Sequence, residues 1–143
     1  MDKKFKLFFI VFLSVVFLDL SSKFLVRLFI PLDSSFGGNG FYLVHWLNTG
    51  SLFGIAKGSS LFLTIFSFIV LFFFGFYIKQ SLRSYPFISG FLIAGVVGNL
   101  VDRLLFGAVT DFIKLPFWPA FNFAGMALSL SVLVLVLFLW RSK

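Results

Sequence analysis

Carboxylate side chains are the first candidates for chemistry in this 143-residue chain, because they are few and there is no glutamate. Asp19, Asp102 and Asp111 lie inside or at the ends of long apolar runs. The remaining two, Asp2 and Asp33, lie at the amino terminus and in a polar loop. An ionised carboxylate in apolar surroundings costs free energy unless it is paired, hydrated or used, so each of the first three is a candidate functional residue.

Asp111 is the best candidate for acid–base chemistry. It lies in the apolar stretch 109–113, and the nearest cation in sequence, Lys114, comes three residues later. Apolar neighbours favour the neutral form of a carboxyl group and raise its pKa, which suits a general acid or base working near neutral pH. An ordinary loop aspartate would give the same pattern, and the sequence leaves both interpretations open.

A second group of charged residues has helical spacing. Asp19, Lys23 and Arg27 are at i, i+4 and i+8, so they share one face of a helix. The structural interpretation is that Lys23 neutralises Asp19, while Lys23 and Arg27 extend their charged ends to the outer membrane interface.

A third group consists of Asn99, Asp102 and Arg103, at i, i+3 and i+4. Side chains of adjacent helical residues point about 100° apart, so Asp102 and Arg103 are each expected to find a partner on another element. A structural network and substrate contact by Asn99 or Arg103 both fit this spacing.

Composition excludes several function classes. The chain has one histidine, no cysteine and no glutamate, so a metal site is not expected, nor is a cofactor. The net charge of +7 is placed beside apolar spans and forms no basic face, which argues against nucleic-acid binding.

The elements that must position these side chains are membrane helices. The chain is 60% hydrophobic with 25 phenylalanines and has a mean hydropathy of +1.09, more apolar surface than a soluble domain can bury. An all-α membrane protein in one domain, 1–143, is predicted. Its four spans, each near the ~20 residues that cross a bilayer, are about 5–30, 60–78, 86–105 and 120–140.

Cations give the orientation of these spans. Four crossings place seven of them on one side of the membrane, and the positive-inside rule makes that side cytoplasmic, together with both termini. Between the first two spans, turn residues and an aromatic, β-branched run predict a small extracytoplasmic β platform, about 33–57. The seven cations are Lys3, Lys4, Lys6, Lys79, Arg83, Arg141 and Lys143.

Five short stretches, taken in order, resemble the lipoprotein signal peptidases, the signal peptidase II family of membrane aspartic proteases. Each alone is a weak motif, but five in sequence on a four-span frame are specific. They run Asp19-Leu20-Ser21-Ser22-Lys23, Asn48-Thr49-Gly50-Ser51-Leu52-Phe53-Gly54, Gly98-Asn99-Leu100-Val101-Asp102-Arg103, Val109-Thr110-Asp111-Phe112 and Trp118-Pro119-Ala120-Phe121-Asn122-Phe123-Ala124.

The resemblance implies a four-helix bundle with an outer β-cradle, a monomer in the bacterial inner membrane. Its substrates would be prolipoproteins whose cysteine carries a diacylglyceryl group, cut just before that cysteine. Asp111 matches a catalytic aspartate, and Asp19 and Asp102 match aspartates that support the fold, with Lys23 beside Asp19. The positions matching the substrate site are Asn48, Asn99, Arg103 and Asn122.

The chain departs from the family pattern at Gly125, where a second catalytic aspartate is expected after Asn122-Phe123-Ala124. A carboxyl dyad needs one group to activate water and one to protonate the carbonyl. Three hypotheses follow: residual or altered cleavage, binding of lipidated signal peptides without cleavage, or a small membrane scaffold or transporter subunit whose Asp19–Arg27 face lines a polar path.

Overall fold

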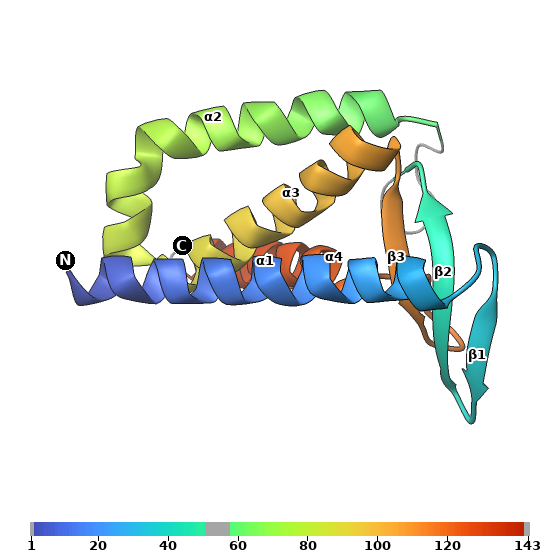
Figure 1. Ribbon diagram of the computed structural model, residues 1–143. Helices are drawn as coiled ribbons and strands as arrows, with labels where there is room; N and C mark the ends of the chain where they lie inside the picture. The colour runs from blue at the N-terminus through green and yellow to red at the C-terminus, as the bar shows by residue number, and fades with distance from the viewer. Residues whose placement is uncertain (1, 51–57, 142–143) are drawn as a thin grey trace.

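The structure is a computed structural model that describes residues 2–50 and 58–141. Helices account for most of it, and a small sheet lies at one end of the bundle, away from both chain termini (Figure 1). Parts of the second resemblance motif and of the predicted platform, at 51–57, lie outside the described residues, as do Lys57 and Lys143. The helices are α1 (Lys3–Phe29), α2 (Ser60–Ser84), α3 (Pro86–Phe106) and α4 (Phe123–Arg141).

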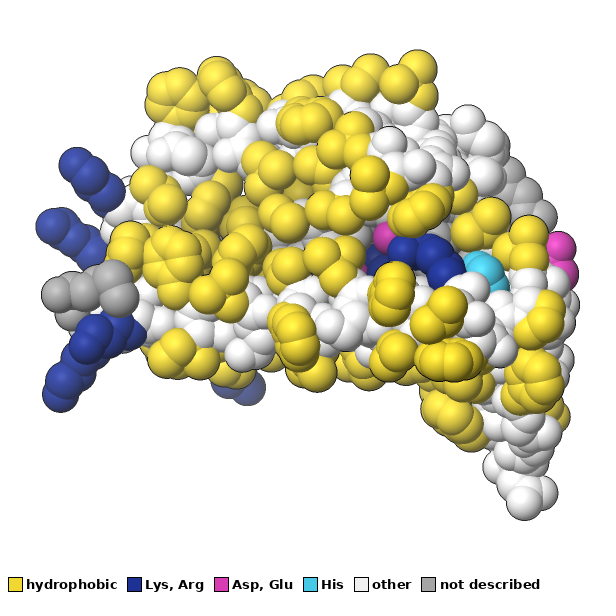
Figure 2. Space-filling view, viewed as in Figure 1, with side chains coloured by type: hydrophobic (Ala, Val, Ile, Leu, Met, Phe, Trp, Pro, Cys, Tyr) yellow, Lys and Arg dark blue, Asp and Glu magenta, His cyan; other side chains and the backbone are white. Residues whose placement is uncertain are grey.

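Three of these helices, α1, α2 and α3, are long and apolar enough to cross a membrane. Apolar side chains cover most of the helical surface in Figure 2, and on α2 they are exposed on nearly every turn. Such a surface is stable in lipid and not in water, so the chain is a membrane protein. The apolar stretch Phe123–Phe138 of α4 is shorter than the other three.

Helix α3 is the centre of the bundle and packs against the other three helices. Small residues allow this close approach: a Cβ on Gly95 would lie 2.5 Å from the Ala124 carbonyl oxygen, and one on Gly98 would lie 2.7 Å from Asp19 Oδ2. Membrane helices pack through such small residues because lipid gives no hydrophobic force that drives them together. The backbones of α1, α3 and α4 thus meet around the level of Asp19.

The sheet has three antiparallel strands in the order β1 (Ser35–Gly38), β2 (Phe41–Asn48) and β3 (Val109–Lys114). Asn39 and Gly40 connect β1 to β2 with φ of 53° and 92°, the left-handed conformations that a two-residue hairpin turn requires. The β2–β3 register shifts between Leu43 and Trp46. This irregularity lets consecutive β2 residues, Val44 and His45, both be buried.

The prediction of the β platform was therefore incomplete, because it lacked one strand. Strands β1 and β2 fall within 33–57, as expected, but β3 comes from the chain between α3 and α4. Helix boundaries also differ: α2 continues to Ser84, beyond the predicted end at 78, and α4 begins at Phe123 and not at 120. The helix α2 extends past its apolar stretch. Its last turns contain polar residues, so the apolar pattern did not predict them.

Candidate active site

Asp111 is on strand β3, and its interpretation as a loop aspartate is wrong. It pairs with Trp46 of β2 in the sheet register. On the other edge of β3, Phe112 and Ile113 donate their backbone N–H groups to the Phe121 carbonyl at 3.0 and 2.9 Å. The β-branched residues of the strand favour this extended conformation. With both edges occupied, the sheet holds the Asp111 backbone in one place.

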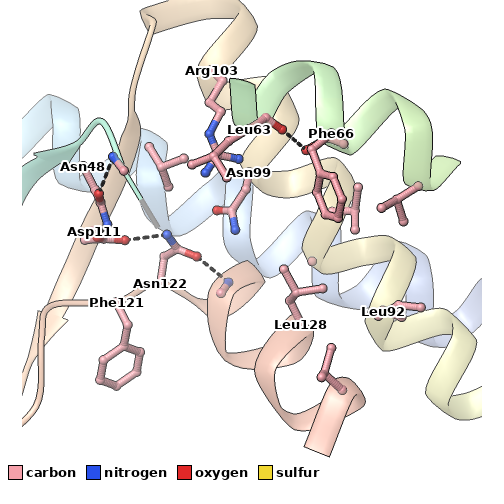
Figure 3. A pocket seen from close by; sticks show the side chains of 18 residues that line it. Asn48, Leu63, Phe66, Leu92, Asn99, Arg103, Asp111, Phe121, Asn122 and Leu128 are labelled. Carbon is pink, nitrogen blue, oxygen red and sulfur yellow. Dashed lines mark hydrogen bonds between the residues drawn. The ribbon is translucent and has the colours of Figure 1, made fainter. Parts of the chain in front are cut away.

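Two asparagine amides hold the Asp111 carboxyl group. Asn48 Nδ2 donates to Oδ2 at 2.9 Å, and Asn122 Nδ2 donates to Oδ1 at 2.6 Å (Figure 3). The residue is 5% exposed. Both donors are neutral amides. Among the described residues, no cation forms an ion pair or hydrogen bond with this carboxyl group.

Burial raises the pKa of Asp111 to about 6, because a charged carboxylate loses its hydration there. The hydrogen bonds from Asn48 and Asn122 lower the pKa in part, as does the more distant attraction of Lys23. Repulsion from Asp102 raises it slightly. A carboxyl group with this pKa holds or gives up a proton near neutral pH, which is what acid–base chemistry requires.

Asn122 connects Asp111 to the start of α4. Its Oδ1 accepts the backbone N–H of Gly125 at 2.6 Å, as the N-cap residue of a helix does. Its Nδ2 bonds the Thr110 carbonyl at 3.3 Å as well as Asp111. A single side-chain amide therefore separates the Asp111 carboxyl group from the backbone of Gly125.

A cavity of about 360 Å³ lies beside these groups, between the sheet and α2, α3 and α4. Most of its wall is apolar, and Asp111 and Gly125 line it together with five other polar side chains: Asn48, Ser67, Asn99, Arg103 and Asn122. Arg103 Nε is buried and has no hydrogen-bond partner among the described residues. An unused donor beside a cavity can bind a ligand carbonyl or carboxylate group.

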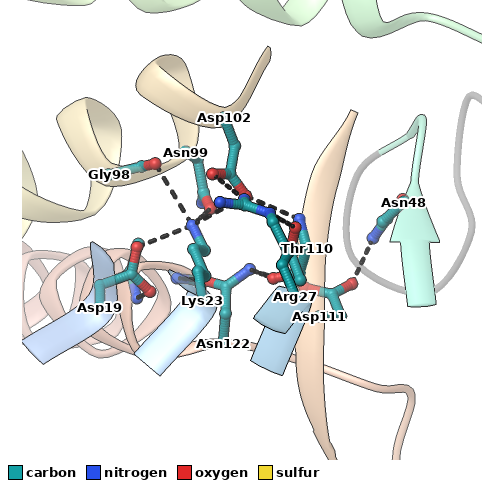
Figure 4. A network of polar contacts seen from close by, with 12 residues as sticks. Asp19, Lys23, Arg27, Asn48, Gly98, Asn99, Asp102, Thr110, Asp111 and Asn122 are labelled. Atoms are coloured by element: carbon teal, nitrogen blue, oxygen red, sulfur yellow. Dashed lines mark hydrogen bonds and ion pairs between the residues drawn. The ribbon is translucent and has the colours of Figure 1, made fainter. Parts of the chain in front are cut away.

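The second charged group forms a buried network between α1 and α3. Lys23 Nζ lies 2.7 Å from Asp19 Oδ2 and 3.5 Å from Asp102 Oδ2, and all three side chains are at most 1% exposed (Figure 4). Lys23 also donates to the Gly98 carbonyl at 3.2 Å and to Asn99 Oδ1 at 3.3 Å. Lys23 does neutralise Asp19, but the prediction that it reaches the membrane interface is wrong, because its ammonium is fully bonded inside the bundle.

Asp102 and Arg103, although adjacent, use different partners. Asp102 Oδ1 accepts from Arg27 Nη2, and Oδ2 accepts the Thr110 backbone N–H at 2.7 Å. Arg27 also donates to Thr110 Oγ1 from Nε at 3.0 Å. Asp102 thereby ties the end of α3 to the strand that carries Asp111, while Arg103 faces the cavity.

The sequence-predicted residues fall into two sets that meet at Thr110. Asp111, Asn48, Asn122, Asn99 and Arg103 line the cavity. The supporting residues pack behind the strand, and Thr110 bonds both sets through its hydroxyl, N–H and carbonyl groups. Sequence reasoning missed Thr110. It comes directly before Asp111 in a β-branched run, and because successive side chains of a strand point to opposite faces, this position predicts that Thr110 and Asp111 face opposite sides.

The described residues include no group of three histidine or aspartate side chains placed to hold a metal ion. The polar side-chain groups that line the cavity are a carboxyl group, amides, a guanidinium group and the Ser67 hydroxyl.

Comparison with known proteins shows which family the whole chain resembles. Residues 11–141 match the model of the family described as Signal peptidase (SPase) II. A lipoprotein signal peptidase of Halothermothrix orenii is 33% identical over 139 residues, covering 94% of this chain and 96% of the relative. One of Syntrophomonas wolfei is 36% identical over 137 residues, covering 92% of each chain.

Solved structures agree with these sequence matches. A bacterial membrane enzyme determined by the in meso method at 2.3 Å resolution superposes with a TM-score of 0.85 at 26% identity, covering 94% of this chain and 87% of that one. A second, at 1.9 Å resolution, gives a TM-score of 0.82 at 26% identity, covering 95% and 94%.

Proposed function

The chain belongs to the signal peptidase II family, and from that premise we propose that its cavity binds lipid-modified lipoprotein precursors with an incomplete carboxyl dyad. Its function is of the lipoprotein signal peptidase type. The observation that carries the proposal is the Asp111 carboxyl group, which lies at a cavity whose described lining contains no second carboxylate.

Hydrolysis by a carboxyl dyad needs two proton transfers at once. One carboxylate takes a proton from the attacking water while the other carboxyl group gives one to the peptide carbonyl oxygen. Asp111 can serve as either the base or the acid, since its pKa lies near neutrality. It cannot do both in one step, so slow cleavage or binding without cleavage is the expected behaviour.

Asp102 does not replace the missing carboxyl group. Both of its oxygens are used, by Arg27 and by the Thr110 N–H. Turning it to the cavity would leave the Arg27 guanidinium and a buried backbone donor without partners, which costs several kcal/mol. Asp19 is equally committed to Lys23 and the Ala124 N–H.

The polar groups around Asp111 have roles in substrate binding under this proposal. Arg103 Nε has an unused hydrogen for a peptide carbonyl oxygen. Asn48 and Asn122 hold the Asp111 carboxyl group toward the cavity. The apolar walls of the cavity suit the hydrophobic segment of a signal peptide.

The same proposal includes a monomer in the bacterial inner membrane, with four crossings, both termini in the cytoplasm and Asn48 and Asp111 facing outward. The support is that six described cations lie at the helix ends away from the sheet: Lys3, Lys4, Lys6, Lys79, Arg83 and Arg141. A cysteine introduced at position 38, where nothing lies within 4 Å of a new Cβ, should react with a membrane-impermeant reagent on intact cells. Labelling only after lysis would contradict the orientation.

The test of function is incubation of the purified protein with a diacylglyceryl-modified precursor, measuring binding and cleavage separately. The Gly125→Asp variant should raise cleavage by about 10²-fold or more, because each positioned acid or base contributes roughly 10²–10⁴-fold. Space permits the change: a Cβ on Gly125 meets only Asn122 within 4 Å, with Oδ1 at 3.2 Å. Asn122 must therefore shift by a few tenths of an ångström.

Gly125→Asn is the matched control, with nearly the same size and no carboxyl group. It should leave cleavage at the parent level, and Asp111→Asn should abolish the gain in the Gly125→Asp background. If folded Gly125→Asp protein binds the precursor and cleaves no faster than Gly125→Asn, the incomplete-dyad account is wrong. If the parent neither binds nor cleaves the precursor, the scaffold or transporter hypothesis replaces the proposal.

A further inference from the structure

A second cavity, of about 400 Å³, lies at the end of the bundle away from the sheet, between the first turn of α1 and the last two turns of α2. Figure 1 shows α2 bending toward the amino end of α1 there. This cavity shares no residue with the one beside Asp111. The residues that line it are Asp2, Lys4, Phe5, Ile78, Lys79, Leu82 and Arg83.

The charges around this cavity are mostly positive: three cations and one carboxylate. The carboxylate of Asp2 is used as the N-cap of α1, accepting the Lys4 backbone N–H at 3.3 Å. Lys4 Nζ donates to the Arg83 carbonyl at 2.5 Å, which ties the two helix ends together. Among the described residues, the Lys79 ammonium and the Arg83 guanidinium have no ion-pair or hydrogen-bond partner.

The floor of the cavity is apolar. Phe5, Ile78 and Leu82 give it apolar walls, and Leu82 is 7% exposed. Figure 2 shows Lys and Arg side chains projecting from this end of the molecule, next to the apolar surface of the helices. Unpaired cations above an apolar floor, at the end of membrane helices, match the two parts of a phospholipid: a charged headgroup and its acyl chains.

We infer that this cavity binds an anionic phospholipid, with its phosphate between Lys79 and Arg83 and the first part of an acyl chain against Phe5 and Leu82. A soluble phosphate would use the cations alone and leave the apolar floor unoccupied. A zwitterionic lipid would bring a fourth cation to a place that already has three. Bound lipid would hold the α1 and α2 ends together in the same way as the Lys4 contact does.

The experiment is native mass spectrometry of the purified full chain, given equal amounts of phosphatidylglycerol and phosphatidylcholine with the same acyl chains. The parent should retain phosphatidylglycerol selectively. A cation near a lipid headgroup contributes roughly a fivefold gain in affinity, so Lys79→Gln/Arg83→Gln should lower retention by about 10-fold or more. If the double variant does not fold, the single variants carry the test, each with a several-fold loss.

The matched control is Lys3→Gln/Lys6→Gln, which removes the same charge at the same end from exposed residues that do not line the cavity. It should keep selective retention. An equal loss in this control would mean that overall charge, and not a site, attracts the lipid, which overturns the inference. So would a parent that retains both lipids equally, or displacement of phosphatidylglycerol by millimolar inorganic phosphate.

Discussion

Two groups of polar residues lie on either side of Thr110 and differ in one respect. Behind the strand, Asp19, Lys23, Asp102 and Arg27 are paired charge to charge inside the bundle. In front of it, Asp111 is held only by neutral amides and borders a cavity. Both groups are buried, so burial alone does not distinguish a structural carboxylate from a reactive one.

The two groups differ in whether their carboxylate oxygens remain available to a ligand. Each oxygen of Asp19 and Asp102 is bonded to a cation or to a backbone N–H group, so neither carboxylate has an oxygen free for a substrate. The Asp111 carboxyl group has only amide donors, and its burial raises its pKa to about 6. Buried ion pairs cost much to break and gain little over apolar packing. The paired network therefore fixes the positions of α1, α3 and α4, and the Asp111 carboxyl group stays available at the cavity.

Breaking the paired network should have the largest effect on stability. Lys23→Met leaves two buried carboxylates without their shared cation, and we expect a loss of about 3–5 kcal/mol in unfolding free energy. Chemical denaturation in detergent micelles measures it. Asp19→Asn/Lys23→Met should recover part of this loss, because Asn keeps an acceptor for the Ala124 N–H; no recovery would mean that the pair is not the cause.

Removing the Asp111 carboxylate should change the pH dependence of stability. The folded-state pKa of Asp111 is raised, so its burial costs nothing below pH 3.8 and costs increasingly more as the pH rises to about 6. Parent stability should fall across that window by roughly 3 kcal/mol relative to Asp111→Asn. Unfolding at a series of pH values checks this prediction, and a constant difference between the two proteins would contradict it.

The glycine beneath the paired network gives a smaller effect. Gly98→Ala brings a methyl group within 2.7 Å of Asp19 Oδ2 and 2.9 Å of Ala124 Cβ, and overpacking of this kind costs about 1–3 kcal/mol. Gly75→Ala on α2 is the control, because nothing lies within 4 Å of the new methyl group. It should stabilise the helix slightly. Equal behaviour of the two variants in thermal unfolding would disprove close packing at Gly98.

Asn122→Ala should have the smallest effect on stability and a clear effect on the site. Loss of the helix N-cap costs about 1 kcal/mol. Losing one amide donor to Asp111 should raise the pKa of that carboxyl group further. Asn122→Ser keeps an N-cap acceptor for the Gly125 N–H without the amide donor and is the control for stability. A carboxyl titration by NMR that shows no upward shift of Asp111 in Asn122→Ala would contradict this role.

Much of the fold follows from sequence alone. Apolar runs of about bilayer length fix the helices, since backbone groups in lipid must bond within their own segment. The hairpin 35–48 follows from its turn residues, Asn39 and Gly40. The site residues Asp111, Asn48, Asn122, Asn99 and Arg103 came from motif order, and the structure brings them to one cavity.

Tertiary structure decided the rest. Strand β3 forms because β2 and Phe121 supply hydrogen-bond partners for its two edges. The sequence of its six residues does not show which distant segments those partners are. Lys23 is buried because Gly98 and Asp102 of α3 pack against the Asp19–Lys23 face of α1 and surround its ammonium group. Spacing reveals which residues share a helix face, but the partners across that face, which set each charge's free energy, exist only once the helices have packed.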